Sequence, residues 1–135
     1  MKIYFLLLFA ILLNLSCNKK DNIYKEDAKD NNYIVYYFHP TARCESCINL
    51  ENYIKEVIDT KFANKNFVFK PVNIEEKENE HFRKDYDLKF SSIIIANPVK
   101  NKWKNLDSIW SYTEDKNKFF NYAENQINNF INTDK

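Results

Sequence analysis

The chain has 135 residues, which is enough for one small domain. Its net charge of +1 provides no basic field, so we expect no nucleic-acid partner. The hydrophobic fraction of 44% suffices for a globular core, while glycine is absent and asparagine occurs twenty times. We therefore expect Asn or Asp at positions that require a positive φ, because they tolerate it best after glycine.

The first seventeen residues have the pattern of an export signal. Lys2 is followed by a nearly unbroken apolar run from Ile3 to Leu13. As a helix this run would span roughly 17 Å, well short of the ~30 Å hydrocarbon core of a membrane. The pattern therefore predicts a secretory signal peptide over residues 1–17, and not a permanent transmembrane helix.

Cys17 follows Leu15 and Ser16 at the end of this segment and precedes polar residues. The arrangement resembles a bacterial lipoprotein signal, in which such a cysteine becomes the lipidated N-terminus, although Asn14 replaces the usual leucine. The resemblance implies an extracytoplasmic lipoprotein, anchored through Cys17 at the periplasmic face or the cell surface. The polar residues 18–32 would then be a tether. The alternatives are a plain secreted protein and an uncleaved anchor, with Cys17 incidental.

The folded part is expected to begin with a strand at residues 33–38, which are β-branched or aromatic throughout. Pro40 ends it, because proline cannot continue a ladder. A helix is predicted from Cys44 to Lys61, where apolar residues recur at helical spacing. Thr41 or Arg43 is expected near its N-cap.

A second strand is predicted at Phe67–Val72, and Pro71 indicates that it lies near an edge or ends early. The charged residues 75–86 that follow predict a short helix. Phe82 and Tyr86 are four residues apart in it and should both face inward.

The third predicted strand, residues 91–96, leads into a turn at residues 97–101. A fourth strand at residues 102–106 would pair antiparallel with the third, whereas residues 107–112 are ambiguous. Thr113 is the predicted N-cap of a last helix from Glu114 to about Ile131. The element order is therefore β-α-β-α-β-β-α, an α/β arrangement with a parallel pair and an antiparallel hairpin.

The segment Cys44-Glu45-Ser46-Cys47 stands directly after the first strand, at the start of the first helix. In this context the Cys-x-x-Cys pair resembles the thioredoxin-like superfamily. The segments Val72–Glu75 and Asp85–Lys89 are similar to those around that family's later strands. The resemblance covers about residues 33–132. It implies a thioredoxin-like domain over residues 33–135, with a central mixed four-stranded sheet flanked by helices.

The chain departs from the family at two places. The family has a cis-proline at the start of the third strand, facing the active site, where this chain has Ser91 and Ser92. We expect a trans peptide there, because a non-proline cis bond costs ~3 kcal/mol. This departure puts the usual mode of substrate docking in question. Arg43 replaces the tryptophan that usually precedes the first cysteine.

The resemblance implies a thiol–disulfide oxidoreductase that uses Cys44 and Cys47 and no cofactor. The attacking group must be a thiolate, and a free thiol with a pKa of ~8.5 is mostly protonated at neutral pH. The helix N-terminus and the charge of Arg43 should lower the pKa of Cys44, the attacking thiol. Cys47 lies about one helical turn after Cys44, and its thiol would resolve the mixed disulfide. His39 would be a proton relay, a positive neighbour or simply a loop histidine.

Expected partners are exported proteins that carry thiols or disulfides, and we expect the protein to be a monomer. A reducing role outside the cytoplasm would also require a membrane partner that supplies electrons. The membrane itself would be reached through the N-terminal lipid on Cys17.

Three other interpretations of the cysteine pair stay open. A structural staple is disfavoured, because so small a loop adds little chain-entropy stabilisation. A copper(I) or zinc site would need further ligands, and His39 or His81 would supply them only by coincidence, so we assign no metal ligands. A non-catalytic module would use the same fold to bind proteins, with Trp103 and Trp110 as the aromatic surface.

Overall fold

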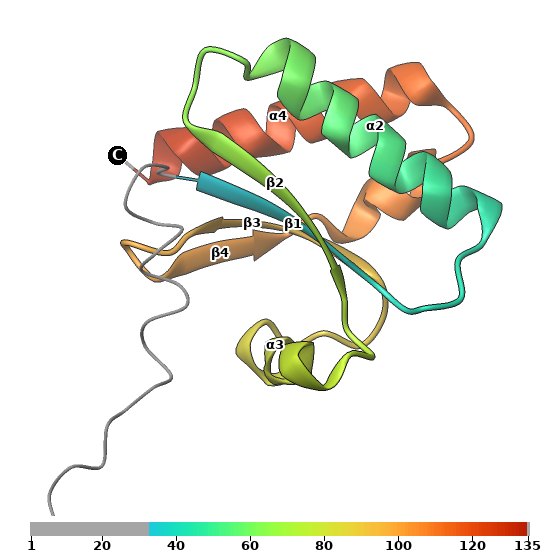
Figure 1. Ribbon diagram of the computed structural model, residues 1–135. Helices are drawn as coiled ribbons and strands as arrows, with labels where there is room; N and C mark the ends of the chain where they lie inside the picture. The colour runs from blue at the N-terminus through green and yellow to red at the C-terminus, as the bar shows by residue number, and fades with distance from the viewer. Residues whose placement is uncertain (1–32, 135) are drawn as a thin grey trace, which may run out of the picture.

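The computed structural model describes residues 33–134 (Figure 1). The predicted signal peptide at 1–17 with Cys17, and the tether at 18–32, lie outside the described residues. The elements in chain order are β1 (Tyr33–His39), α2 (Glu45–Lys61), β2 (Phe67–Asn73), the 3-10 turn η1 (Lys77–Asn79), α3 (His81–Asp85), β3 (Ser92–Asn97), β4 (Lys102–Asn105), the 3-10 helix η2 (Asp107–Tyr112) and α4 (Lys116–Thr133).

The four strands form one mixed sheet in the order β2-β1-β3-β4. The strand β1 pairs in parallel with β2 and antiparallel with β3, which in turn pairs antiparallel with β4. The prediction of an α/β fold with a mixed four-stranded sheet is therefore confirmed. Pro71 lies in β2 at the edge of the sheet, as its missing N–H group requires, although the strand continues to Asn73.

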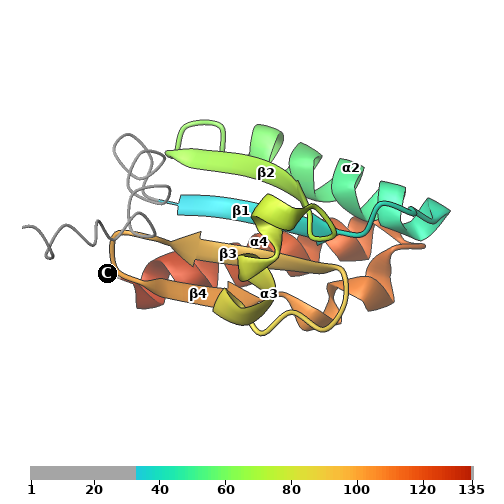
Figure 2. The same cartoon turned by 60° about the horizontal axis from the view of Figure 1, so that its bottom comes forward.

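Helices cover both faces of this sheet. Figure 2 shows α3 in front of the sheet and the long helices α2 and α4 behind it. Both faces of the sheet must be covered, because successive side chains of β1 point to opposite faces. Val35 and Tyr37 are buried with α2 and α4, while Ile34, Tyr36 and Phe38 are buried with α3.

The segment between β2 and β3 differs from the single short helix predicted for residues 75–86. It is divided into η1 and α3, with Glu80 between them. Asn79 donates a side-chain hydrogen bond to the carbonyl of Asn73 at 2.9 Å, and such local bonds compete with a continuous helix. Phe82 and Tyr86 are each 8% exposed, so the inward-facing pair is confirmed.

The start of the last helix also differs from the prediction. Asp115, and not Thr113, is the N-cap of α4, and its carboxylate accepts a hydrogen bond from the backbone N–H of Lys118 at 3.1 Å. Hydrogen bonds from the backbone and the side chain of Lys118 hold the pKa of Asp115 below its usual value. Thr113 ends η2 instead, where its hydroxyl donates to the carbonyl of Trp110 at 3.2 Å.

Two residues have a positive φ within the described range, Asp87 at 48° and Asn101 at 52°. Both residue types are those expected where glycine is absent. The same range contains no cis peptide bond, so the bond between Ser91 and Ser92 is trans, as expected.

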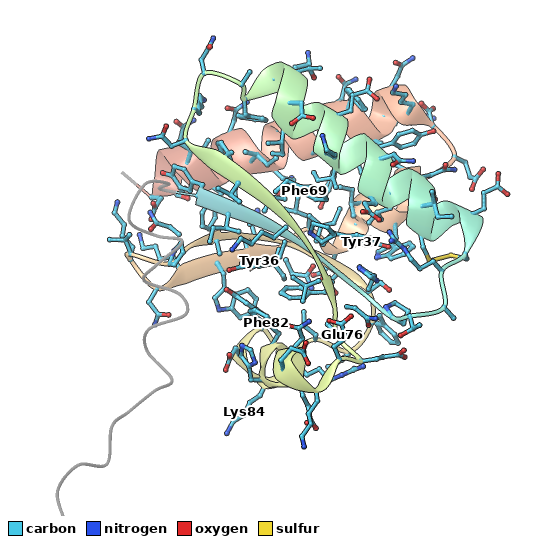
Figure 3. The ribbon with its side chains drawn as sticks, in the orientation of Figure 1. Tyr36, Tyr37, Phe69, Glu76, Phe82 and Lys84 are labelled. Atoms are coloured by element: carbon cyan, nitrogen blue, oxygen red, sulfur yellow. A yellow bond between two sulfur atoms is a disulfide. The ribbon has the colours of Figure 1, made fainter. Side chains whose placement is uncertain are left out.

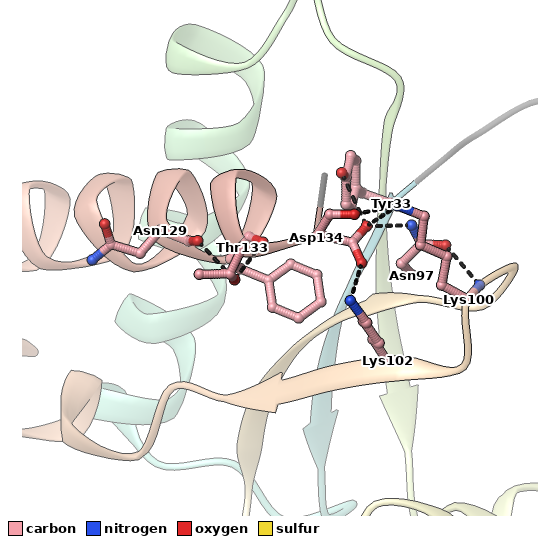
Figure 4. Close-up of polar contacts among 8 residues, drawn as sticks. Tyr33, Asn97, Lys100, Lys102, Asn129, Thr133 and Asp134 are labelled. Atoms are coloured by element: carbon pink, nitrogen blue, oxygen red, sulfur yellow. Dashed lines mark hydrogen bonds and ion pairs between the residues drawn. The ribbon is translucent and has the colours of Figure 1, made fainter.

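The buried carboxylate of Asp134 joins the two ends of the described chain (Figure 4). It accepts hydrogen bonds from the side-chain amide of Asn97 at 2.6 Å and from the hydroxyl of Tyr33 at 3.2 Å. The ammonium groups of Lys100 and Lys102 lie 3.6 and 3.3 Å from its oxygens. One side chain therefore links the start of β1, the β3–β4 hairpin and the end of α4.

Candidate active site

Cys44 and Cys47 form a disulfide at the N-terminal end of α2, with Cα atoms 5.0 Å apart; its yellow bond is visible in Figure 3. The strand β1 ends at His39, the chain bends at residues 41–42, and the backbone of Cys44 is extended, with φ −86° and ψ 168°. Cys44 is therefore the N-cap of α2, and the helix itself begins at Glu45, one residue later than predicted.

The sulfur of Cys44 takes the place that a capping oxygen normally has. It accepts a hydrogen bond from the backbone N–H of Cys47 at 3.2 Å. The N–H groups of a first helical turn have no partner within the helix, and they carry the positive end of the helix dipole. Once the disulfide is reduced, this environment stabilises negative charge on the sulfur of Cys44.

The two cysteines differ in their access to solvent. Cys44 is exposed, whereas Cys47 is only 8% exposed. A sulfur arriving from another molecule can therefore reach Cys44 far more readily than Cys47. The asymmetry fits an attacking thiol followed by a protected one.

Arg43 has two partners in the structure. Its guanidinium forms an ion pair with the carboxylate of Glu51, and it lies 5.5 Å from the centroid of the Tyr37 ring. The charge that we expected beside Cys44 is therefore largely compensated by Glu51 on the next turns of α2.

Tyr37 is fully buried on the face of the sheet that α2 covers (Figure 3). Its hydroxyl donates a hydrogen bond of 3.0 Å to the carbonyl of Cys47, so β1 directly supports the first turn of α2. Burial raises the pKa of Tyr37, although the nearby charge of Arg43 opposes the rise. Sequence reasoning singled out neither Tyr37 nor Glu51. The available signal was that Glu51 stands four residues after Cys47, on the same face of the helix.

His39 lies at the end of β1, where its Nδ1 atom is 3.0 Å from the carbonyl of Pro40. Its ring centroid is 5.4 Å from that of Tyr37. The adjoining loop is held by the backbone N–H of Thr41, which donates to the carboxylate of Glu75 at 3.0 Å and keeps the pKa of Glu75 below its usual value. The loop that leads to Cys44 is therefore fixed against the end of β2.

The sheet places Ser91 and Ser92 at the same end as this loop, because Ser92 pairs with Phe38 near the end of β1. The hydroxyl of Ser92 donates to the carbonyl of Phe90 at 3.0 Å. The carbonyl of Ser91 accepts a hydrogen bond of 3.1 Å from the indole of Trp110. Both serines are thus tied into local backbone structure, and the indole fixes the loop that precedes β3.

A groove of about 770 Å³ begins at these serines and runs along β4. Phe90 and Trp103 border it and are 78% and 42% exposed. Sequence reasoning did not predict the groove, although it noted the aromatic side chains of Trp103 and Trp110. The other lining residues are Tyr86, Asp87, Lys89, Asn105 and Asp107.

Two kinds of feature are absent from residues 33–134. No group of three or more His, Cys, Asp and Glu side chains within this range could hold a metal ion. No helix in the same range is long and apolar enough to cross a membrane.

No family model matches this sequence. No curated protein matches it either. The functional conclusion therefore depends on the geometry of the site.

Proposed function

We propose that the domain has a thioredoxin-like fold and acts as a thiol–disulfide oxidoreductase through Cys44 and Cys47. The observation that carries the proposal is the placement of exposed Cys44 as the N-cap of α2, with its sulfur accepting the N–H of Cys47. The mixed sheet, with the cysteine pair between its central strand β1 and α2, supports the fold assignment.

In the reducing direction, the Cys44 thiolate attacks one sulfur of a substrate disulfide. The substrate S–S bond breaks, and its leaving sulfur takes a proton from water. Cys47 then loses its proton to water and attacks the sulfur of Cys44, the mixed disulfide breaks, and the second substrate sulfur leaves as a thiolate that takes a proton from water. The products are the Cys44–Cys47 disulfide and a substrate reduced by two electrons. The oxidising direction is the reverse of these steps.

The proposed setting is extracytoplasmic, with the domain tethered to a membrane through lipidated Cys17 and acting on exported proteins with thiols or disulfides. It is supported by the apolar run of residues 3–13 and by the Leu-Ser-Cys end of the segment. Mass spectrometry of the mature N-terminus tests it, since an unmodified Cys17 would contradict lipidation.

The oxidoreductase proposal is tested by equilibrating the purified protein with mixtures of reduced and oxidised glutathione. We expect a reversible two-electron transition, and we expect Cys44→Ser to abolish mixed-disulfide formation while Cys47→Ser traps it. If the protein shows no thiol–disulfide exchange at any glutathione ratio, the proposed oxidoreductase activity is refuted. Stoichiometric copper(I) or zinc in the reduced protein would instead support the metal-binding alternative.

A further inference from the structure

The ion pair between Arg43 and Glu51 spans the turn that carries Cys47. Arg43 immediately precedes Cys44, while Glu51 lies two turns into α2. Their side chains are only 27% and 22% exposed, so water screens the pair less than an ordinary surface pair.

Tyr37 gives this ion pair a fixed position. Its buried ring lies under the guanidinium of Arg43, and its hydroxyl is bound to the carbonyl of Cys47. The guanidinium is therefore held from one side by a carboxylate and from another by an aromatic face. The ion pair holds the charge of Arg43 beside Glu51, and the Tyr37 ring supports the guanidinium from β1.

From this arrangement we infer that Glu51 is a positioning residue, which retains Arg43 over Tyr37 and limits how strongly its charge stabilises the Cys44 thiolate. The inference rests on the proposed function, since the thiolate is the attacking species. Glu51 thus sets the reactivity of Cys44 and the redox potential of the pair. Other ionisable groups around this end of α2 are Tyr37 and His39 on β1, Glu45 on α2, Glu75, whose carboxylate accepts from the N–H of Thr41 at 3.0 Å, and Glu114, whose carboxylate accepts from Ser46 at 3.4 Å.

The size of the effect follows from the geometry of α2. Glu51 is seven residues beyond Cys44, which is about 10 Å along a helix. Between the dielectric of water and that of a protein surface, the charge of Glu51 at this separation changes the ionisation constant of Cys44 directly by about twofold to fifteenfold, and this direct share persists when Arg43 is absent. Freeing Arg43 stabilises the thiolate, and hence the reduced form. A tenfold change in the equilibrium with glutathione corresponds to about 30 mV.

The test compares Glu51→Gln with the unaltered protein. The first measurement is the pKa of the Cys44 thiol, from the pH dependence of alkylation at Cys44, followed by peptide mass spectrometry of the reduced protein. The second is the reduction potential against glutathione. We expect a lower pKa, faster alkylation of Cys44 at neutral pH and a higher potential.

A matched control is Glu56→Gln, because Glu56 lies on the same helix and is also paired, with Lys116 at 2.7 Å. This control should leave the pKa of Cys44 and the potential unchanged. Thermal unfolding of both variants checks that each is folded.

A double-mutant cycle separates a role through Arg43 from a direct role of Glu51. If Glu51 acts by holding Arg43, the effect of Glu51→Gln shrinks in the Arg43→Gln background. An equal effect in both backgrounds, or no shift relative to Glu56→Gln, would overturn the inference. Alkylation requires no disulfide substrate. A protein that never exchanged with glutathione would therefore refute the proposed function, while the pKa of Cys44 still decided the role of Glu51.

Discussion

Replacing Asp134 by alanine tests how strongly the C-terminal end of the chain holds the domain together. Its carboxylate is 2% exposed and accepts hydrogen bonds from Asn97 and Tyr33. It is also the shared counter-charge of Lys100 and Lys102.

The magnitude follows from what the substitution leaves behind. Asn97 is 4% exposed, so its amide would lose a buried acceptor, which costs about 1–3 kcal/mol. The side chains of Lys100 and Lys102 are 45% and 52% exposed and regain water, so each loss adds at most about 1 kcal/mol. We therefore expect Asp134→Ala to reduce the free energy of unfolding by about 1–5 kcal/mol.

The assay is urea unfolding at neutral pH, followed by circular dichroism. Asp59→Ala is the matched control, because Asp59 pairs with Lys55 at 2.5 Å but both side chains are more than half exposed. We expect the control to change stability by no more than about 0.5 kcal/mol. If Asp134→Ala costs no more than this control, the assignment of a stabilising role to the buried carboxylate is wrong.

The same contribution should depend on pH. Burial raises the pKa of Asp134, but hydrogen bonds from Asn97 and Lys102 and the charge of Lys100 outweigh it, so the pKa lies below its usual value. The ionised form is therefore the stabilising one. Its contribution is complete above the unfolded-state pKa of about 3.9 and is lost as the pH falls through the lower folded-state pKa. The stability difference between the unaltered protein and Asp134→Ala should be constant from about pH 5 to 7 and shrink in acid.

Three further predictions concern the site and its supports. Tyr37→Phe removes the hydrogen bond to the Cys47 carbonyl and should lower the free energy of unfolding by about 1 kcal/mol, as measured by urea unfolding; an unchanged midpoint would show that the hydroxyl contributes nothing. Asp115→Ala should lower the melting temperature of the domain by more than Thr113→Ala does, because only Asp115 caps α4. The opposite ranking would indicate that Thr113 is the N-cap, as the sequence predicted. In single-cysteine comparisons of reduced protein, Cys44 should be alkylated at least about tenfold faster than Cys47 at neutral pH, because it is exposed and its sulfur lies at the helix N-terminus; equal rates would contradict the assigned roles.

Strongly patterned segments were predicted to within one or two residues. The strand β1 needs apolar side chains on both faces because helices cover both, and the unbroken run at residues 33–38 indicated this directly. The start of α4 was predicted wrongly because two residues of good capping type, Thr113 and Asp115, stand close together. The backbone decided between them, since Thr113 is helical, with φ −62° and ψ −24°, whereas Asp115 is extended.

The candidate site was predicted in part. The sequence indicated the Cys44–Cys47 pair and its place at the start of a helix, because a strand, a breaking proline and a helical pattern follow one another locally. It did not indicate the partner of Arg43. The direction of that side chain depends on how α2 is rotated over β1, which is a property of packing.

By itself, then, the sequence determined the order of strands and helices, the cysteine pair between β1 and α2, and the use of Asp and Asn at positive φ, since each follows from neighbouring residues. Only the tertiary structure decided that Glu51 and Tyr37 hold Arg43, and that Asp134 binds Tyr33 across 101 positions of sequence. These contacts depend on which helix face meets the sheet and on where the end of α4 meets the start of β1. No spacing within a single segment specifies such long-range pairs.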